Sequence, residues 1–348
     1  MRNVVRSLKP LLFGVILCLR GFAMTIPLHA QEQNAPQSNA REQDAREPVP
    51  MIFDTDMQTD VDDVGAAAVL HALADRGEIE ILATMVSVAY PWSVPCTDAI
   101  NTFYGRPGLP IGTVKGGGVV RSSNYARQIA EEFPHDLKTA DAAPDAVALY
   151  RKVLAAQADG SVVIVTVGYL TNLAGLLDSG ADEWSALNGH ELVRRKVKQW
   201  VCMGGKFPRG LETNLRFDAP ASVKAVNAWP TPVLFSGWEI GQEIRTGHTL
   251  KEKTPPTNLV RRAYELYLGP QKTQRESWDQ TAVLVAARGL SGYWDAVTHG
   301  TNHIFADGSN EWRSTPDSNH AYLVEKMNPR DVAEVIEEFM TAAPRERR

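Results

Sequence analysis

Apolar and polar positions follow a regular order along most of the chain, from Pro50 to Ala287. Short apolar runs predict strands that are buried on both faces, because they lack the alternation of a half-exposed strand. These runs are 50–53, 79–88, 110–112, 161–167, 197–203 and 232–236. Longer runs with helical spacing predict helices at 64–73, 96–104, 143–156, 170–177, 219–228, 259–268 and 279–287. Strands that alternate with helices indicate an α/β protein with a mostly parallel central sheet and helices on both faces.

The pattern changes at both ends of this region. Beyond Tyr293 it becomes short and alternating, which predicts a C-terminal hairpin added to the sheet, followed by a closing helix at 329–340. Residues 31–48 contain almost no large apolar side chain, so they predict a disordered linker. Residues 49–343 then form a single catalytic domain, which is long enough for a substantial core.

The first thirty residues predict a secretory signal peptide. Arg2, Arg6 and Lys9 precede an apolar run at 11–19, and the segment ends at the small residue Ala30. The apolar run is too short to span a bilayer, and Leu17 is not the small residue that a lipid-attachment signal needs before its cysteine. We therefore expect a secreted or periplasmic protein without membrane attachment after the signal is removed.

Charge and cysteine content narrow the class of protein. The net charge of −5 and the pI of about 5.9 provide no basic face, which argues against a nucleic acid polymer as partner. Only Cys96 and Cys202 remain after signal removal. Export would permit a disulfide between them, but Cys202 lies in a strand-like apolar run, so we expect no bond.

Five aspartates, 54, 56, 60, 62 and 63, occupy one connection between a predicted strand and a predicted helix. Their mutual repulsion is costly unless a cation neutralises it. Oxygen ligands without a nearby His or Cys favour calcium or magnesium over zinc. The alternative is a solvated acidic loop in which some aspartates cap the helix that starts near Val64.

The segment DTDMQTDVDD, residues 54–63, resembles the DxDxxxDD signature of the inosine-uridine-preferring nucleoside hydrolase family, with two extra residues. The resemblance implies the Rossmann-like fold of that family, a Ca²⁺ ion bound by Asp56 and Asp63, and Asp62 as the general base. Asp60 has no counterpart in the shorter signature and is either a hydrogen-bonding neighbour or a rival for one of these roles. The segment FDTD also fits a phosphotransferase motif of the haloacid dehalogenase type, but Gln58 and the pair Asp62-Asp63 do not fit it.

Two later segments resemble the same family in the same order. VTVGYLTNLA, residues 165–174, is similar to its GPLTNLA turn, which implies a calcium ligand in the Val167 carbonyl. The segment from Met203 to Pro220 is similar to its MGG and ExN motifs. There Glu212 and Asn214 match residues that bind ribose hydroxyls.

A third segment, residues 277–283 (SWDQTAV), is similar to the family's HDPxAV. The resemblance implies that Asp279 completes the calcium site, whereas the residue type alone also fits a simple helix N-cap. Trp278 replaces the histidine proposed to protonate the leaving base. Trp278 and Trp238 are therefore candidates either to stack on that base or to form plain pocket wall. One of the three late histidines is a candidate to enter the pocket, but placement at the surface or in the core is favoured for all three: His299, His303 and His320.

Two further departures concern the pocket. Residues 86–91 lack the asparagine that the family has after its second strand, and Lys206 stands near another expected asparagine. The residues implied to bind the metal and activate water therefore match the family more fully than the residues implied to assist the leaving base.

These features predict a calcium-dependent hydrolase of N-glycosidic bonds in small nucleosides or related N-ribosides. The alternative is an exported calcium-dependent sugar- or nucleoside-binding protein without turnover. The adjacent pair Asp62-Asp63 favours the hydrolase, because binding alone does not require a free base. Family members tend to be homo-oligomers, dimers or tetramers, which is all the resemblance implies for assembly.

Overall fold

The computed structural model describes residues 47–316 and 318–345. The predicted signal peptide and nearly all of the predicted linker lie outside these residues. Within the described part, every helix is too short or too polar to cross a membrane.

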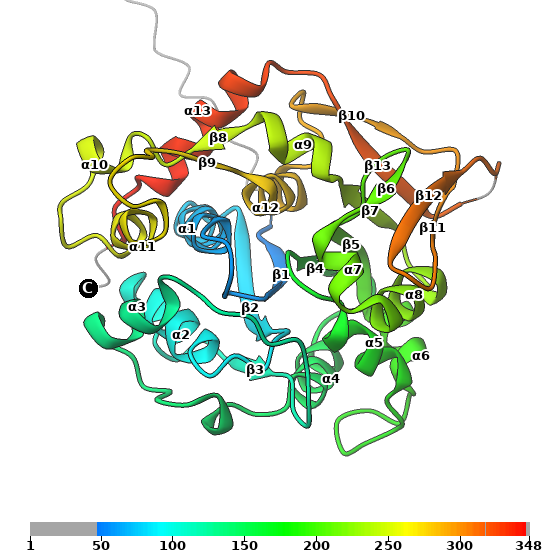
Figure 1. Cartoon of the computed structure of the whole chain (residues 1–348). Coiled ribbons are helices and arrows are strands. Elements are labelled where there is room, and N and C mark those ends of the chain that lie inside the picture. The colour runs from blue at the N-terminus through cyan, green and yellow to red at the C-terminus, as the bar shows by residue number, and fades with distance from the viewer. Residues whose placement is uncertain (1–46, 317, 346–348) are drawn as a thin grey trace, which may run out of the picture. The chain divides into compact units, whose positions relative to one another are not determined.

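An eight-stranded sheet forms the centre of the domain (Figure 1). All neighbouring strands are parallel except β10 and β13, which pair antiparallel. In spatial order the strands are β10 (Trp294–Val297), β13 (His320–Glu325), β7 (Val233–Ser236), β5 (Val197–Met203), β4 (Val162–Thr166), β1 (Val49–Thr55), β2 (Ile79–Val86) and β3 (Ile111–Thr113). The predicted mostly parallel α/β sheet is thus confirmed.

Helices cover both faces of this sheet (Figure 1). One face packs against α1 (Asp62–Asp75), α2 (Ser93–Phe103), α3 (Ala126–Glu132), α11 (Leu259–Leu268), α12 (Trp278–Arg288) and α13 (Pro329–Met340). The other packs against α4 (Ala146–Ala156), α5 (Thr171–Asp178), α6 (Gly189–Lys196) and α8 (Ala219–Ala228). The shorter helical elements are η1 (Ala140–Ala142), α7 (Thr213–Phe217), α9 (Trp238–Glu243) and α10 (Leu250–Lys253).

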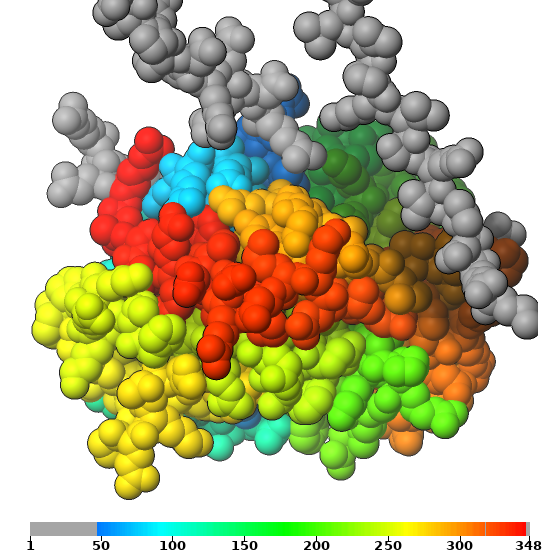
Figure 2. Space-filling view, turned by 90° about the horizontal axis from the view of Figure 1, so that it is seen from above, coloured from blue at the N-terminus to red at the C-terminus, as the bar shows by residue number. Residues whose placement is uncertain are grey.

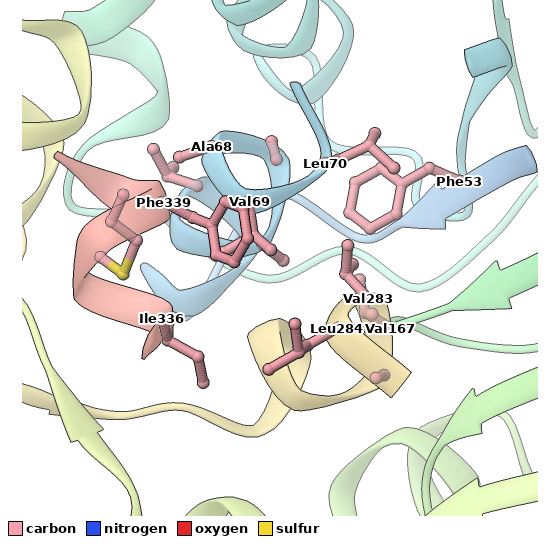
Figure 3. Close-up of a cluster of buried hydrophobic side chains, with 14 of the residues drawn as sticks. Phe53, Ala68, Val69, Leu70, Val167, Val283, Leu284, Ile336 and Phe339 are labelled. Atoms are coloured by element: carbon pink, nitrogen blue, oxygen red, sulfur yellow. The ribbon is translucent and has the colours of Figure 1, made fainter. Parts of the chain in front are cut away.

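The two-sided cover explains why the central strands are apolar at nearly every position. In β1, the Phe53 side chain joins the core cluster on the α1 face, and Ile52 joins the cluster on the opposite face. Successive residues of a strand point to opposite faces, so both must be apolar where helices cover both. Figure 3 shows Phe53 beside Leu70 of α1 and Val283 of α12, with Ile336 and Phe339 of α13 on the far side of the same cluster. Figure 2 shows α13 (red) at the surface of the molecule.

The C-terminal part adds more than the predicted hairpin. Strands β11 (Thr301–Ile304) and β12 (Ser309–Arg313) form the hairpin, which pairs with β6 (Arg209–Leu211) in a separate three-stranded sheet. Strand β13 joins the central sheet beside β7, and β10 forms its edge. A further two-stranded sheet consists of β8 (Arg245–Thr246) and β9 (Arg275–Glu276).

Cys96 and Cys202 are both buried and free. Cys96 belongs to the core cluster on the α1 face and Cys202 to the cluster on the other face. The sheet lies between the two thiols, in agreement with the prediction of no disulfide.

Candidate active site

The carboxyl ends of neighbouring parallel strands open into one hollow, as is typical of α/β sheets. The segments that follow β1, β4, β5 and β7 contribute to it, together with the start of α12. Its empty volume is about 560 Å³, a figure that includes the open mouth. Its lining residues are Asp56, Thr59, Asp60, Asp62, Asp63, Val167, Met203, Glu212, Thr213, Asn214, Trp238, Arg275, Trp278 and Asp279.

Three buried carboxylates meet at this hollow. Asp62 and Asp63 lie in the first turn of α1, and Asp279 lies in the first turn of α12, which packs against α1. One oxygen from each lies within 4.8 Å of the others, so the group can hold a metal ion. The structure thus brings together residues that are more than two hundred positions apart in the sequence.

Hydrogen bonds hold the two adjacent aspartates in different orientations. Asp63 accepts hydrogen bonds from the Thr55 hydroxyl and, at 3.2 Å, from the backbone N–H of Met57. Asp62 Oδ2 instead accepts from the backbone N–H of Asp279 at 3.3 Å. Asp56 is buried next to Asp63 and shares a hydrogen bond with it.

Burial makes the charged forms of these carboxyls costly. It raises the pKa of Asp56 to about 7, and it raises the pKa of Asp62, Asp63 and Asp279 well above the usual value, with a further increase from their neighbours' charges. Among the described residues that line the hollow, the only cation is Arg275. The donors are hard oxygens without His or Cys, so the set fits an oxygen-preferring divalent cation.

Asp60 lies at the rim and forms an ion pair. Arg275 donates to it through Nε at 3.0 Å and Nη2 at 2.5 Å. Of the two roles left open by the sequence, the position fits the hydrogen-bonding neighbour. Sequence reasoning did not single out Arg275, because no local pattern links it to an aspartate 215 residues earlier.

Asp54 points away from the hollow. Its carboxylate accepts hydrogen bonds from the Tyr150 hydroxyl at 2.9 Å and from Asn172 Nδ2 at 3.1 Å. Burial raises its pKa to about 7. Asp54 is still in β1 and, like Ile52, points to the face of the sheet opposite α1, whereas Asp56 follows the end of the strand and lines the hollow.

The residues matched to ribose binding line the hollow but also have structural partners. Glu212 is the N-cap of α7 and accepts from the backbone N–H groups of Asn214 at 2.7 Å and Gly205 at 3.1 Å. Asn214 Nδ2 donates to the Val167 carbonyl at 3.0 Å. The carbonyl proposed as a metal ligand therefore faces the site with Asn214 beside it.

Trp278 and Trp238 both line the hollow and contact each other, since Trp278 Nε1 donates to the Trp238 carbonyl at 2.7 Å. The late histidines are absent from the described lining residues. His320 is buried and accepts from the Asn302 N–H at 3.1 Å, and burial lowers its pKa to about 4. This agrees with the expected core or surface placement.

The family model of the inosine-uridine preferring nucleoside hydrolases matches residues 51–328, most of the chain. The chain belongs to this family. Its members act on small-molecule nucleosides and depend on a metal ion, which the buried aspartate group is able to bind. Family and fold together identify the chain as an N-glycosyl hydrolase of the ribonucleoside hydrolase type.

Solved structures of several nucleoside hydrolases share the fold. A plant nucleoside hydrolase is 18% identical, with 85% of this chain and 99% of that chain covered and a TM-score of 0.62. A purine-preferring ribonucleoside hydrolase from Gardnerella vaginalis is 16% identical, with 85% and 99% covered and a TM-score of 0.66. The type III effector protein XopQ, in complex with adenosine diphosphate ribose, is 15% identical, with 86% and 95% covered and a TM-score of 0.63. No curated protein matches the chain.

Proposed function

We propose that this nucleoside hydrolase family member is an exported, calcium-dependent enzyme that hydrolyses the N-glycosidic bond of nucleosides or related N-ribosides. The observation that carries the proposal is the meeting of three buried carboxylates from α1 and α12 at the bottom of the hollow. A carboxylate group of this kind supplies both cation ligands and a proton acceptor.

Calcium would be held by the carboxylates of Asp56, Asp63 and Asp279 and by the Val167 carbonyl. Support comes from the hard oxygen donors and from the cost of leaving these buried carboxylates without a counterion. When bound, calcium would orient the sugar hydroxyls and make water more acidic.

Asp62 would accept the proton of the attacking water. Its Oδ2 is held by the Asp279 amide, and no donor among the described residues reaches its Oδ1. Burial raises the pKa of Asp62, which suits a base that works near neutral pH. As positive charge develops on the sugar ring, the surrounding carboxylates would stabilise it.

Glu212 and Asn214 would bind the ribose hydroxyls, since both line the hollow beside the aspartate group. Rearrangement of their present hydrogen bonds would accompany substrate binding. Trp278 would form a wall for the base.

Export rests on the order of basic, apolar and small residues in the first thirty positions. Mass spectrometry of the natively expressed protein should find a mature chain that starts near Gln31. Recovery of the intact chain from the cytoplasm would contradict export without affecting the proposed reaction.

The decisive experiment measures release of free base and reducing sugar from a panel of nucleosides, with calcium and with a chelator. Turnover that depends on calcium supports the proposal. If the protein binds nucleosides but releases no base from any of them, the calcium-dependent binding protein is the correct description.

A further inference from the structure

Charge is distributed unevenly over the hollow. Six acidic residues line it, at positions 56, 60, 62, 63, 212 and 279, whereas Arg275 is the only basic one among the described residues. The Arg275 side chain is 26% exposed, but Asp62, Asp63 and Asp279 are at most 4% exposed. The Arg275 side chain therefore lies near the mouth of the hollow, and the carboxylates proposed to bind calcium lie at its bottom.

Neighbouring side chains hold the Arg275 guanidinium in place. Nε and Nη2 donate to Asp60, and Nη1 donates to Glu276 at 2.7 Å. The guanidinium carbon lies 5.1 Å from the centre of the Trp278 ring, which forms a wall of the hollow. An arginine has five N–H donors, so two N–H groups, one on each terminal nitrogen, have no acceptor among the described residues.

The reaction needs positive charge at the mouth. When the C–N bond breaks, its electron pair stays on the nitrogen of the base, and negative charge builds there. Water activated at Asp62 attacks from the bottom of the hollow, so an in-line displacement directs the leaving group towards the mouth. No histidine lines the hollow in the described part of the chain, so no imidazolium is available there to protonate the base.

Building on the proposed function, we propose that Arg275 hydrogen-bonds to the departing base and stabilises its developing negative charge. Water would transfer its hydroxyl to the anomeric carbon and its proton to Asp62, while the base would take up a proton from solvent. Arg275 itself would stay protonated throughout, since guanidinium does not lose its proton in proteins. Fixed donors aimed at developing charge are among the strongest catalytic effects in enzymes.

Asp60 is the positioning residue in this scheme. It belongs to the segment with two extra residues relative to the family signature. Its carboxylate accepts hydrogen bonds from two nitrogens of the guanidinium. Planar, two-point pairing fixes the direction of the remaining N–H groups. A lysine at position 275 would retain the charge but lose this geometry.

The test compares two substrates in each protein. Inosine has a poor leaving group, whereas 4-nitrophenyl β-D-ribofuranoside releases a phenolate that needs little stabilisation. Arg275→Gln should lower kcat for inosine by about 10²–10³-fold, the usual loss for one donor to a developing anion. Its kcat for the nitrophenyl riboside should stay close to that of the wild type, and Arg275→Lys should fall between wild type and Arg275→Gln on inosine.

Arg262→Gln is the matched control. Arg262 also forms a two-point pair, with Glu132 at 2.7 and 2.8 Å, but it is absent from the lining of the hollow. Both substrates should react at wild-type rates in this variant. Partial misfolding lowers both rates equally, so only the ratio of the two rates within one variant reports on leaving-group stabilisation.

Equal losses on both substrates in Arg275→Gln would overturn the inference, as would a change confined to KM. Failure of the proposed function has a different signature, because wild type would then cleave neither substrate.

Discussion

Asp62 and Asp63, adjacent residues at the start of α1, have different hydrogen-bond partners. Asp63 is tied to the chain that leaves β1, through Thr55 and Met57, whereas Asp62 turns towards α12 and accepts from the Asp279 amide. Consecutive residues of a helix point in directions about 100° apart, so one turn presents two carboxylates to two sides of the same site. This divergence supports a separate role for each.

Asp62→Asn should lower turnover by about 10²–10⁴-fold, because the amide retains the side chain's size but not its proton acceptor. Calcium affinity should fall only modestly, since Asp56, Asp63 and Asp279 remain. Asp63→Asn should instead weaken calcium binding, with partial recovery of activity in excess calcium. Steady-state kinetics together with calcium titration distinguish the two variants.

Asp54→Asn is the control for this pair. It removes a buried aspartate from the same segment, but its partners are Tyr150 and Asn172, outside the hollow. Its kinetics should resemble those of wild type. Identical behaviour of the Asp62 and Asp63 variants, or loss of activity in Asp60→Asn alone, would show that the roles are assigned to the wrong aspartates.

At the scale of elements, the turn between β4 and α5 packs directly on the aspartate segment, residues 54–63. A Cβ atom added at Gly168 would lie 2.6 Å from the Asp56 backbone nitrogen and 2.8 Å from both Asp56 Cβ and Ser87 Oγ. Glycine allows this approach because it has no side chain. The turn therefore positions both the Val167 carbonyl and Asp56.

Gly168→Ala should destabilise the protein by about 1–3 kcal/mol, the usual cost of overpacking a buried contact. It should also weaken calcium binding, because the new methyl group displaces Asp56. Urea unfolding and calcium titration measure the two effects. Gly180→Ala, where no atom lies within 4 Å of the added Cβ, should change neither. An unchanged calcium affinity in Gly168→Ala would mean that this turn does not position the site.

At the scale of the whole molecule, the buried carboxyls link stability to pH. Asp54 and Asp56 have pKa values of about 7 in the folded protein, above the unfolded value of about 3.9. Between these values the folded state binds more protons than the unfolded chain. Raising the pH therefore lowers the free energy of unfolding of the cation-free protein.

Calcium should increase the free energy of unfolding more at about pH 7.5 than at about pH 5, because fewer protons must leave the ligands at the higher pH. Urea unfolding with calcium and with a chelator, at both pH values, measures this gain. The lowered pKa of His320 acts in the opposite direction, since it contributes stability that is lost as the pH falls from about 6.5. Comparing calcium and chelator at one pH removes that contribution. An equal gain at both pH values would exclude these carboxyls as the calcium ligands.

The sequence by itself determined the features that depend on local backbone periodicity. Helices α8, α11 and α13 begin and end at the predicted residues, and so does β5, because their apolar spacing directly reflects the period of the element. The aspartate segment was also readable, since Asp56, Asp62 and Asp63 lie within one strand-to-helix connection. Helix α6 was missed because it is short and mostly polar, although Asn188 and Glu191 form a capping box that signals its start.

Only the tertiary structure decided which distant segments meet. Strand β13 lies beside β7 in the central sheet, and β6 pairs with β12, because long-range pairing depends on how the whole sheet buries its faces. The ion pair between Asp60 and Arg275 has the same origin, since the two residues are brought together by the packing of their elements and not by local spacing. The carboxylate cluster could be predicted from residue types, whereas the position of Arg275 at the mouth of the hollow depended on the assembled fold.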